Sequence, residues 1–183
     1  MSKQQGGYRC HLISSQVLPD SSLSEQEQIH RTEPDSIEGI LFTHQARKAL
    51  THAQEKANSF FHNYIDSYHL LLGLFQDPHD APTIIMRHLG INAEQITNMI
   101  LASIHPGQAI TLGEKHFTKS FRTAIFQTAE EAQKLNQAEV GSEHLLLGLS
   151  RTPFGINGSV FLRLGITADQ IRDQIQQLPP LSS

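Results

Sequence analysis

The sequence contains no tryptophan and a single cysteine, Cys10. One cysteine cannot form an internal disulfide, so a disulfide-stabilised secreted domain is excluded and a reducing compartment is favoured. Residues 1–18 lack the continuous apolar core of a secretory signal, and no run approaches the roughly 18 apolar residues of a membrane span. We therefore expect a cytoplasmic protein that does not contact membranes.

Motifs for common catalytic and cofactor chemistry are also missing. The sequence has no G-x-x-x-x-G-K-[ST] phosphate loop, no G-x-S-x-G elbow, and no H-E-x-x-H motif or cysteine cluster. The formal net charge is −4, and no basic stripe alternates with aromatic residues, so nucleic acid is not an expected partner. These absences predict a non-catalytic protein that needs no cofactor and no metal.

The first 40 residues differ in character from the rest. Residues 20–38 are polar, acidic and without periodicity, which predicts a flexible N-terminal tail over 1–40. The only apolar part of this tail lies within 10–18. It suits a docking segment or a brief strand, although a plain disordered tail is the favoured interpretation.

An internal repeat dominates the remaining sequence. Phe42-Thr43 opens one copy and Phe117-Thr118 opens the other, 75 residues later, and the copies align without a gap. Such a match indicates duplication of one supersecondary unit. It predicts a double-repeat domain over 41–178, with repeat 1 at 42–103, a linker at 104–116, repeat 2 at 117–178 and a C-terminal tail at 179–183.

Each copy has the periodicity of four helices and no strand pattern. Thr43 and Thr118 occupy N-cap positions of the first helices. The second helices start near Ser67 and Ser142, and their leucine runs predict that they are the central buried ones. A short third helix and a fourth helix with a capping box follow in each copy, the boxes being Asn92 with Gln95 and Thr167 with Gln170. The fold class expected is all-α.

The sequence contains eleven histidines, but no two stand four residues apart on one predicted helix. His69 and His144 occupy equivalent positions just before the two leucine runs. A shared metal site is one interpretation of this pair. The favoured alternative is that each ring packs on the core and bonds backbone at a helix start.

Three recurring segments resemble a known family. HNYIDSYHLLLGL at 62–74 and AEVGSEHLLLGL at 138–149 are similar to the family pattern hNYIGTEHILLGL. The openings FTHQARKAL and FTKSFRTAI resemble FTxRAxxVL, and HLGINAEQI and RLGITADQI resemble LGxxxxxV. Together these segments resemble the Clp repeat found twice at the N-terminus of Clp-family AAA+ unfoldases such as ClpA, ClpB and ClpC.

The resemblance implies one compact pseudo-twofold helical domain that recruits substrates and adaptors. No ATPase module follows the second repeat in this sequence, so the chain is most similar to standalone versions such as the plant plastid accessory subunits called ClpT. The implied partners are Clp-family ATPase or protease subunits, or their substrates and adaptors.

The resemblance also suggests site residues. In some family members a helix-2 glutamate of each repeat, with the helix-1 threonine, helps to bind phosphoarginine-tagged substrates. Repeat 2 keeps this pattern as Thr118, Ser142 and Glu143. Repeat 1 keeps Thr43 and Ser67 but has Tyr68 in place of the glutamate, and its Asp66 replaces a glycine.

A carboxylate at a helix start can hold a guanidinium, and helix N-terminal amides favour phosphate. Tyr68 cannot supply that charge, although Asp66 could do so from a shifted position, and the tyrosine ring would instead offer an aromatic face. Glu143 also suits a simpler role as a first-turn acid that favours the helix dipole.

Three classes of function therefore remain: a non-catalytic adaptor or accessory factor of the Clp system, a sensor of peptide tags or phosphoarginine-like small molecules that uses the groove between the repeats, and, least favoured, an enzyme.

Overall fold

A computed structural model describes residues 39–107 and 115–178. The tails predicted at 1–40 and 179–183 lie almost wholly outside these residues, as does the apolar segment within 10–18. Much of the predicted linker at 104–116 lies outside them as well.

The described residues form eight helices, four in each repeat, as the sequence predicted. In repeat 1 they are α2 (His44–Ser59), α3 (Ser67–Leu74), α4 (Ala81–His88) and α5 (Ala93–Leu101). In repeat 2 they are α6 (Lys119–Lys134), α7 (Ser142–Ser150), α8 (Gly155–Leu164) and α9 (Ala168–Gln177). The all-α fold class is confirmed, and α8 begins three residues before the predicted Gly158.

The predicted helix starts are confirmed by hydrogen bonds. The Thr43 hydroxyl accepts the Ala46 amide at 3.2 Å, and the Thr118 hydroxyl accepts the Phe121 amide at 3.2 Å. Capping boxes open both α5 and α9. Because the same caps recur 75 residues apart, both copies set their helix boundaries by the same local chemistry.

The prediction that the chain has no strand is wrong in one detail. β1 (Tyr64–Ile65) pairs in parallel with β2 (His116–Phe117), and Phe42 forms an equivalent isolated bridge with Val140. These pairings join one residue or two at a time, too few for a period-two pattern to appear in the sequence. Each of them joins repeat 1 to repeat 2.

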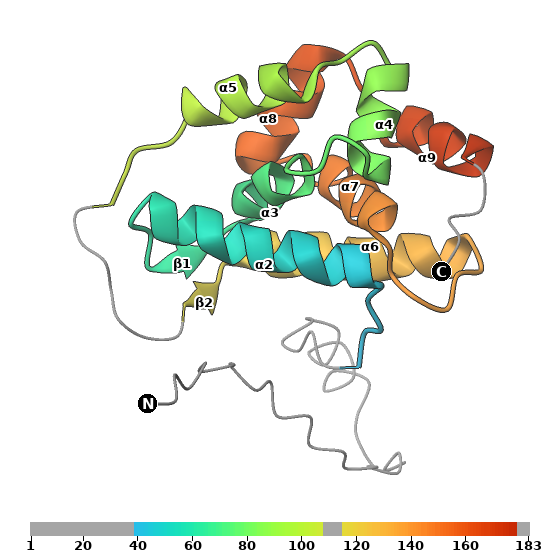
Figure 1. The fold of residues 1–183 in the computed structure, drawn as a ribbon, viewed down its shortest axis with the longest axis horizontal. Helices are drawn as coiled ribbons and strands as arrows, with labels where there is room; N and C mark the ends of the chain where they lie inside the picture. Colours follow the sequence, from blue (N-terminus) through green and yellow to red (C-terminus); the bar gives the residue numbers. More distant parts are fainter. Residues whose placement is uncertain (1–38, 108–114, 179–183) are drawn as a thin grey trace, which may run out of the picture.

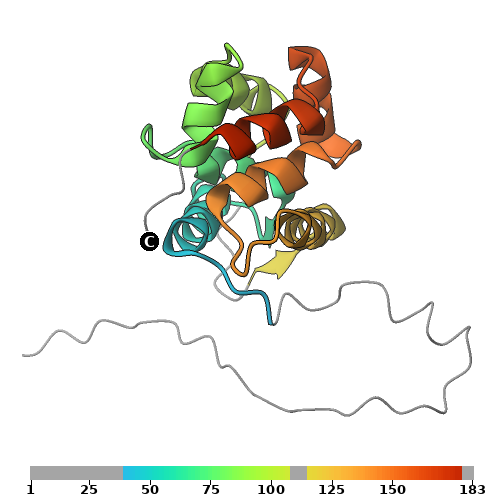
Figure 2. The same ribbon diagram turned by 90° about the vertical axis from the view of Figure 1, so that its right-hand side faces the viewer.

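The helices form three layers (Figure 1). α2 and α6 lie in one layer, α3 and α7 form the middle layer, and α4, α5, α8 and α9 form the third; the turned view in Figure 2 agrees. All eight residues of α3 are buried, as are the leucines of α7, so the prediction that the second helices are central is confirmed. One hydrophobic core therefore runs through both repeats.

Glycines allow the middle layer to approach the first layer closely. A Cβ built on Gly73 of α3 would lie 2.7 Å from the Ala49 carbonyl oxygen of α2. The equivalent Cβ on Gly148 of α7 would lie 2.6 Å from the Thr128 amide nitrogen of α6. Backbone atoms cannot yield to such a contact, so these two glycines set the distance between the layers.

Phe61 and Asn136 occupy equivalent positions after α2 and α6, and both adopt left-handed backbone angles, with φ of 58° and 56°. Asparagine tolerates this conformation, whereas phenylalanine is strained in it by about 1–2 kcal/mol. The Phe61 ring is also 44% exposed, so its replacement loses little burial. We expect Phe61→Asn to raise the free energy of unfolding by roughly 1 kcal/mol in urea titrations. Asn136→Phe is the matched control and should lower it; a loss of stability in Phe61→Asn would contradict the strain argument.

Candidate binding site

The two repeats contact each other at the starts of their helices. In each repeat, the start of the first helix bonds the segment that precedes the second helix of the other repeat. The Thr118 amide at the start of α6 donates to the Ile65 carbonyl before α3 at 3.0 Å. The Thr43 amide at the start of α2 donates to the Val140 carbonyl before α7, also at 3.0 Å. Two pseudo-equivalent junctions result. The first junction comprises Asp66, Ser67, Thr118 and Ser120, and the second comprises Thr43, Gly141, Ser142 and Glu143.

This arrangement corrects the grouping expected from the sequence. Thr118 lies with Asp66 and Ser67 of the other repeat, not with Ser142 and Glu143 of its own. Thr43 lies next to the segment that leads into Ser142 and Glu143. A site built from one repeat alone is therefore not what the fold assembles.

The side chains of the first junction hydrogen-bond to one another. The Thr118 hydroxyl donates to Asp66 Oδ2 at 2.8 Å, and the Ser67 hydroxyl donates to Asp66 Oδ1 at 3.0 Å. The hydroxyls of Ser67 and Ser120 lie 2.6 Å apart. Both oxygens of the Asp66 carboxylate are thus already bonded within the protein, which leaves it a structural role.

The second junction places its carboxylate differently. Gly141 stands at the position of Asp66, and a Cβ built on Gly141 would lie 2.1 Å from Glu143 Oε1. The Glu143 side chain therefore folds back into the space where an Asp66-like side chain would begin. Among the described residues no hydroxyl group donates to Glu143, and its side chain is 14% exposed. Each junction thus holds one carboxylate, and that of Glu143 has bonding capacity left.

Tyr68 does not present its ring to a ligand, because it is 6% exposed. Its hydroxyl lies 3.2 Å from the Tyr64 hydroxyl and 3.2 Å from His62 Nδ1. Burial, with the Tyr64 hydrogen bond, raises the pKa of Tyr68 well above its usual value. His69 Nε2 lies 2.8 Å from His62 Nδ1, and His62 Nε2 lies 2.8 Å from the His105 carbonyl oxygen. Tyr68 therefore belongs to a buried aromatic and histidine cluster of repeat 1.

His69 and His144 support helix starts, as the favoured interpretation predicted. His69 Nδ1 accepts the Asp66 amide and His144 Nδ1 accepts the Gly141 amide, each at 2.9 Å. Burial, aided by His62 and Lys115, lowers the pKa of His69 to about 3.

Burial also lowers the pKa of His144, although the carboxylates of Glu143 and Glu131 oppose it. His144 Nδ1 lies 3.2 Å from Glu143 Oε1, but its lone pair already accepts an amide, so no ion pair forms there at neutral pH. Across residues 39–107 and 115–178, no group of three or more potential ligands could hold a metal ion.

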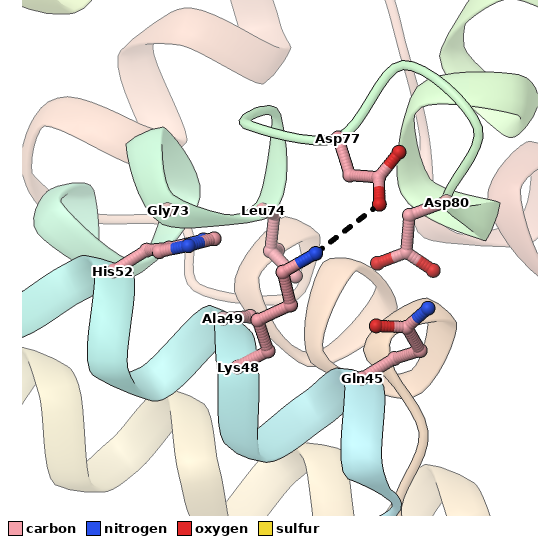
Figure 3. A pocket seen from close by; sticks show the side chains of 8 residues that line it. All are labelled: Gln45, Lys48, Ala49, His52, Gly73, Leu74, Asp77 and Asp80. Atoms are coloured by element: carbon pink, nitrogen blue, oxygen red, sulfur yellow. Dashed lines mark hydrogen bonds and ion pairs between the residues drawn. The ribbon is translucent and has the colours of Figure 1, made fainter.

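A shallow surface depression lies beside the second junction (Figure 3). Lys48 Nζ lies 3.3 Å from Asp77 Oδ2 at its rim. A hydrogen bond from the His79 amide lowers the pKa of Asp77 below its usual value, with Lys48 acting in the same direction. The depression is lined by residues of α2, α3 and the segment leading into α4, namely Gln45, Lys48, Ala49, His52, Gly73, Leu74, Asp77 and Asp80.

Asp80 connects this depression to the second junction, because the Ser142 hydroxyl donates to Asp80 Oδ1 at 2.9 Å. The counterparts of Lys48, Asp77 and Asp80 in the other repeat are all uncharged; they are Thr123, Thr152 and Gly155. The charges that Lys48, Asp77 and Asp80 place beside the second junction are thus absent from the equivalent positions beside the first junction. Sequence reasoning missed Asp80, and only a position-by-position comparison of the two copies could have indicated it.

The helices within the described residues include none with both the length and the apolar content of a membrane span. Two consecutive segments, residues 41–115 and 116–180, match the Clp repeat (R) N-terminal domain.

Among curated relatives, the ClpC/MecB negative regulator of genetic competence from Bacillus subtilis is 35% identical over 137 residues, and the chaperone protein ClpB from Oceanobacillus iheyensis is 33% identical over 141 residues. These matches cover 75% of this chain but 17% of each relative. The chain thus spans about a sixth of the length of these relatives.

Solved structures show the same fold. The N-terminal domain of ClpD from Arabidopsis thaliana matches with a TM-score of 0.56 at 21% identity, covering 74% of this chain and 92% of that one. The Hsp104 N-terminal domain from Candida albicans matches with a TM-score of 0.63 at 17% identity, covering 73% of this chain and 88% of that one. With two matched repeats, this fold and these relatives, the chain belongs to the Clp repeat N-terminal domain family.

Proposed function

We propose that this chain is a cytoplasmic, non-catalytic binding module that acts as an adaptor or accessory factor of a Clp unfoldase or protease. The observation that carries the proposal is the second junction, where no hydroxyl group of the described residues donates to the Glu143 carboxylate at the start of α7. The relatives supply the context, since they are ClpC, a negative regulator of genetic competence, and the chaperone protein ClpB.

Affinity capture tests the adaptor role. The full chain, immobilised through its C-terminus, is expected to enrich Clp ATPase or protease subunits from lysate of its source organism, identified by mass spectrometry. A Glu143→Gln variant is the matched control, because it keeps the shape of the side chain and removes its charge. If Clp subunits are no more abundant than on an unrelated helical protein, the adaptor role is wrong.

Recognition of a guanidinium tag is a second candidate function, and the charges of the second junction favour it. Glu143 lies at the start of α7, and Asp80 and Asp77 extend the acidic surface toward the depression. The N-terminal end of α7 also favours an anion, so a phosphorylated guanidinium matches both features. The first junction lacks this capacity, because Thr118 and Ser67 already bond the Asp66 carboxylate.

We expect one molecule of phosphoarginine, or of an arginine-derived peptide, to bind per chain in calorimetric titrations. Glu143→Gln should weaken this binding by roughly ten- to a hundredfold, since a charge-assisted hydrogen bond contributes about 1.5–3 kcal/mol. Asp66→Asn, the matched control in the first junction, should leave the affinity unchanged. Equal losses in both variants would instead indicate a single groove shared by both junctions, and absence of binding to the wild type would exclude tag recognition.

A further inference from the structure

The outer face of α8 carries two large apolar side chains that the fold leaves in solvent. Phe154, the N-cap residue of α8, is 80% exposed, and Leu162 in its last turn is 81% exposed. The other large apolar residues on the described surface are all less exposed. Exposed apolar surface that is gathered on one element, here α8 and its N-cap, is characteristic of sites that bind a partner.

Repeat 1 provides an internal control for this observation. The residues equivalent to Phe154 and Leu162 are His79 and Arg87, and both are exposed at the corresponding places around α4. Since the same fold accepts an imidazole and a guanidinium there, packing within the domain does not require apolar residues at these two positions. Packing within the domain therefore does not account for their apolar character in repeat 2.

The spacing along α8 suits close approach by a second helix. Phe154 and Leu162 are eight residues apart, about 12 Å along a helix axis. The exposed residues between them include Gly155 and Ser159, and a Cβ built on Gly155 would have nothing within 4 Å. Small residues flanked by two large apolar ones allow another helix to lie across α8 and to insert side chains between them.

The charge of this face indicates what the partner carries. Arg163 is exposed beside Leu162, α8 contains no acidic residue, and Arg163 has no ion-pair partner among the residues described. This local positive charge stands on a chain with a formal net charge of −4. The face is thus complementary to an apolar surface with a carboxylate at its rim.

We propose that the outer face of α8, formed by Phe154, Gly155, Ser159, Leu162 and Arg163, docks an acidic amphipathic helix of a partner protein. The partner helix presents apolar side chains at helical spacing to Phe154 and Leu162 and a carboxylate to Arg163. This face lies in the third layer of helices, while β1 and β2 lie on the opposite side of the middle layer (Figure 1). The proposal does not depend on ligand binding by Glu143.

Selection from a displayed library of 18-residue amphipathic helical peptides tests the proposal, with the full chain as bait. We expect enrichment of peptides that carry an apolar stripe and flanking Asp or Glu. These peptides should bind the double variant Phe154→His, Leu162→Arg at least tenfold more weakly, and Arg163→Glu at least fivefold more weakly at low salt. The double variant introduces the residue types that repeat 1 already accommodates, so it is expected to stay folded, which circular dichroism checks.

The matched control is His79→Ala, Arg87→Ala on the equivalent face of α4, which should bind the peptides as the wild type does. The proposal is overturned if no such peptides are enriched, or if they bind the double variant and the wild type equally. Sedimentation over a range of concentrations tests whether a second copy of this chain binds the face instead. A wild-type dimer that the double variant abolishes would assign the face to a second copy of this chain and overturn the proposal as well.

Discussion

Each repeat expressed alone is expected to remain largely unfolded, whereas the full chain should unfold in a single thermal transition. Each copy has about 60 residues, a size at which an isolated core is marginal. Here the copies also share their core. α3 of repeat 1 contacts α6, α7 and α8 of repeat 2, and α7 contacts α2 and α4 of repeat 1. Separating the copies would expose the leucines of both central helices at once.

The exchanged backbone pairing adds to this dependence. Thr118 requires the Ile65 carbonyl and Thr43 requires the Val140 carbonyl, and each of these bonds crosses between repeats. Circular dichroism and amide NMR spectra of fragments 39–107 and 115–183 should show little fixed structure, and mixing the two fragments should restore it. Thermal unfolding of the full chain should give coincident curves from every probe. A fragment that unfolds cooperatively on its own, or two separated transitions in the full chain, would refute the single cooperative unit.

Local features of the fold could be predicted from the sequence because they depend on residues close in the chain. The Thr43 and Thr118 caps and the capping boxes of α5 and α9 follow from side chains that reach amides within three residues. The leucine runs of α3 and α7 identified the central layer, since they leave no polar face. The gapless repeat then fixed four helices in each copy.

The candidate site could be predicted only in part, because it depends on how the copies pack. The sequence singled out Glu143, Thr43 and Ser142, but it grouped Thr118 with Ser142 and Glu143, and it grouped Thr43 with Ser67 of its own repeat. The start of the first helix in each repeat contacts the other repeat, and the residue spacing within one copy does not indicate this contact. The position of the Glu143 carboxylate could not be predicted either, since it depends on the Glu143 side chain folding back over Gly141, two residues earlier. The pairings of Ile65 and Val140 extend over too few residues to produce a strand pattern.

Glu131→Gln is expected to destabilise the protein by about 2–4 kcal/mol at neutral pH, because breaking a buried ion pair leaves its partners uncompensated. The Glu131 side chain on α6 has no solvent exposure. It lies 2.9 Å from Arg151 after α7 and 2.9 Å from Arg172 on α9, and it accepts a further hydrogen bond from Lys134. The arginines are 28% and 27% exposed, so water reduces the cost somewhat.

The matched control is Glu130→Gln on the same helix. Glu130 also lies 2.9 Å from Arg151, but its side chain is 38% exposed. An exposed ion pair contributes about 0–1 kcal/mol, so the control should change the free energy of unfolding by less than about 1 kcal/mol. Repeat 1 has Lys56 at the position of Glu131, with Gln76 and Thr97 in place of the two arginines. This network is therefore present in repeat 2 and not in repeat 1, and it connects α6 and α9 with the end of α7.

The effect of Glu131→Gln should also depend on pH in a defined direction. Burial alone would raise the pKa of the Glu131 carboxyl, but hydrogen bonds from Lys134 and Arg172 outweigh it and hold the pKa below its ordinary value of 4.5. A carboxyl with a lowered pKa in the folded state binds fewer protons than in the unfolded state, so its contribution is complete above pH 4.5 and is lost as the pH falls through the folded-state pKa. Urea titrations should therefore show a constant difference between wild type and Glu131→Gln above about pH 5.5, shrinking steadily in more acidic buffers. A difference that stays constant down to the acid unfolding of the wild type would mean that shape, and not charge, accounts for the effect of Glu131.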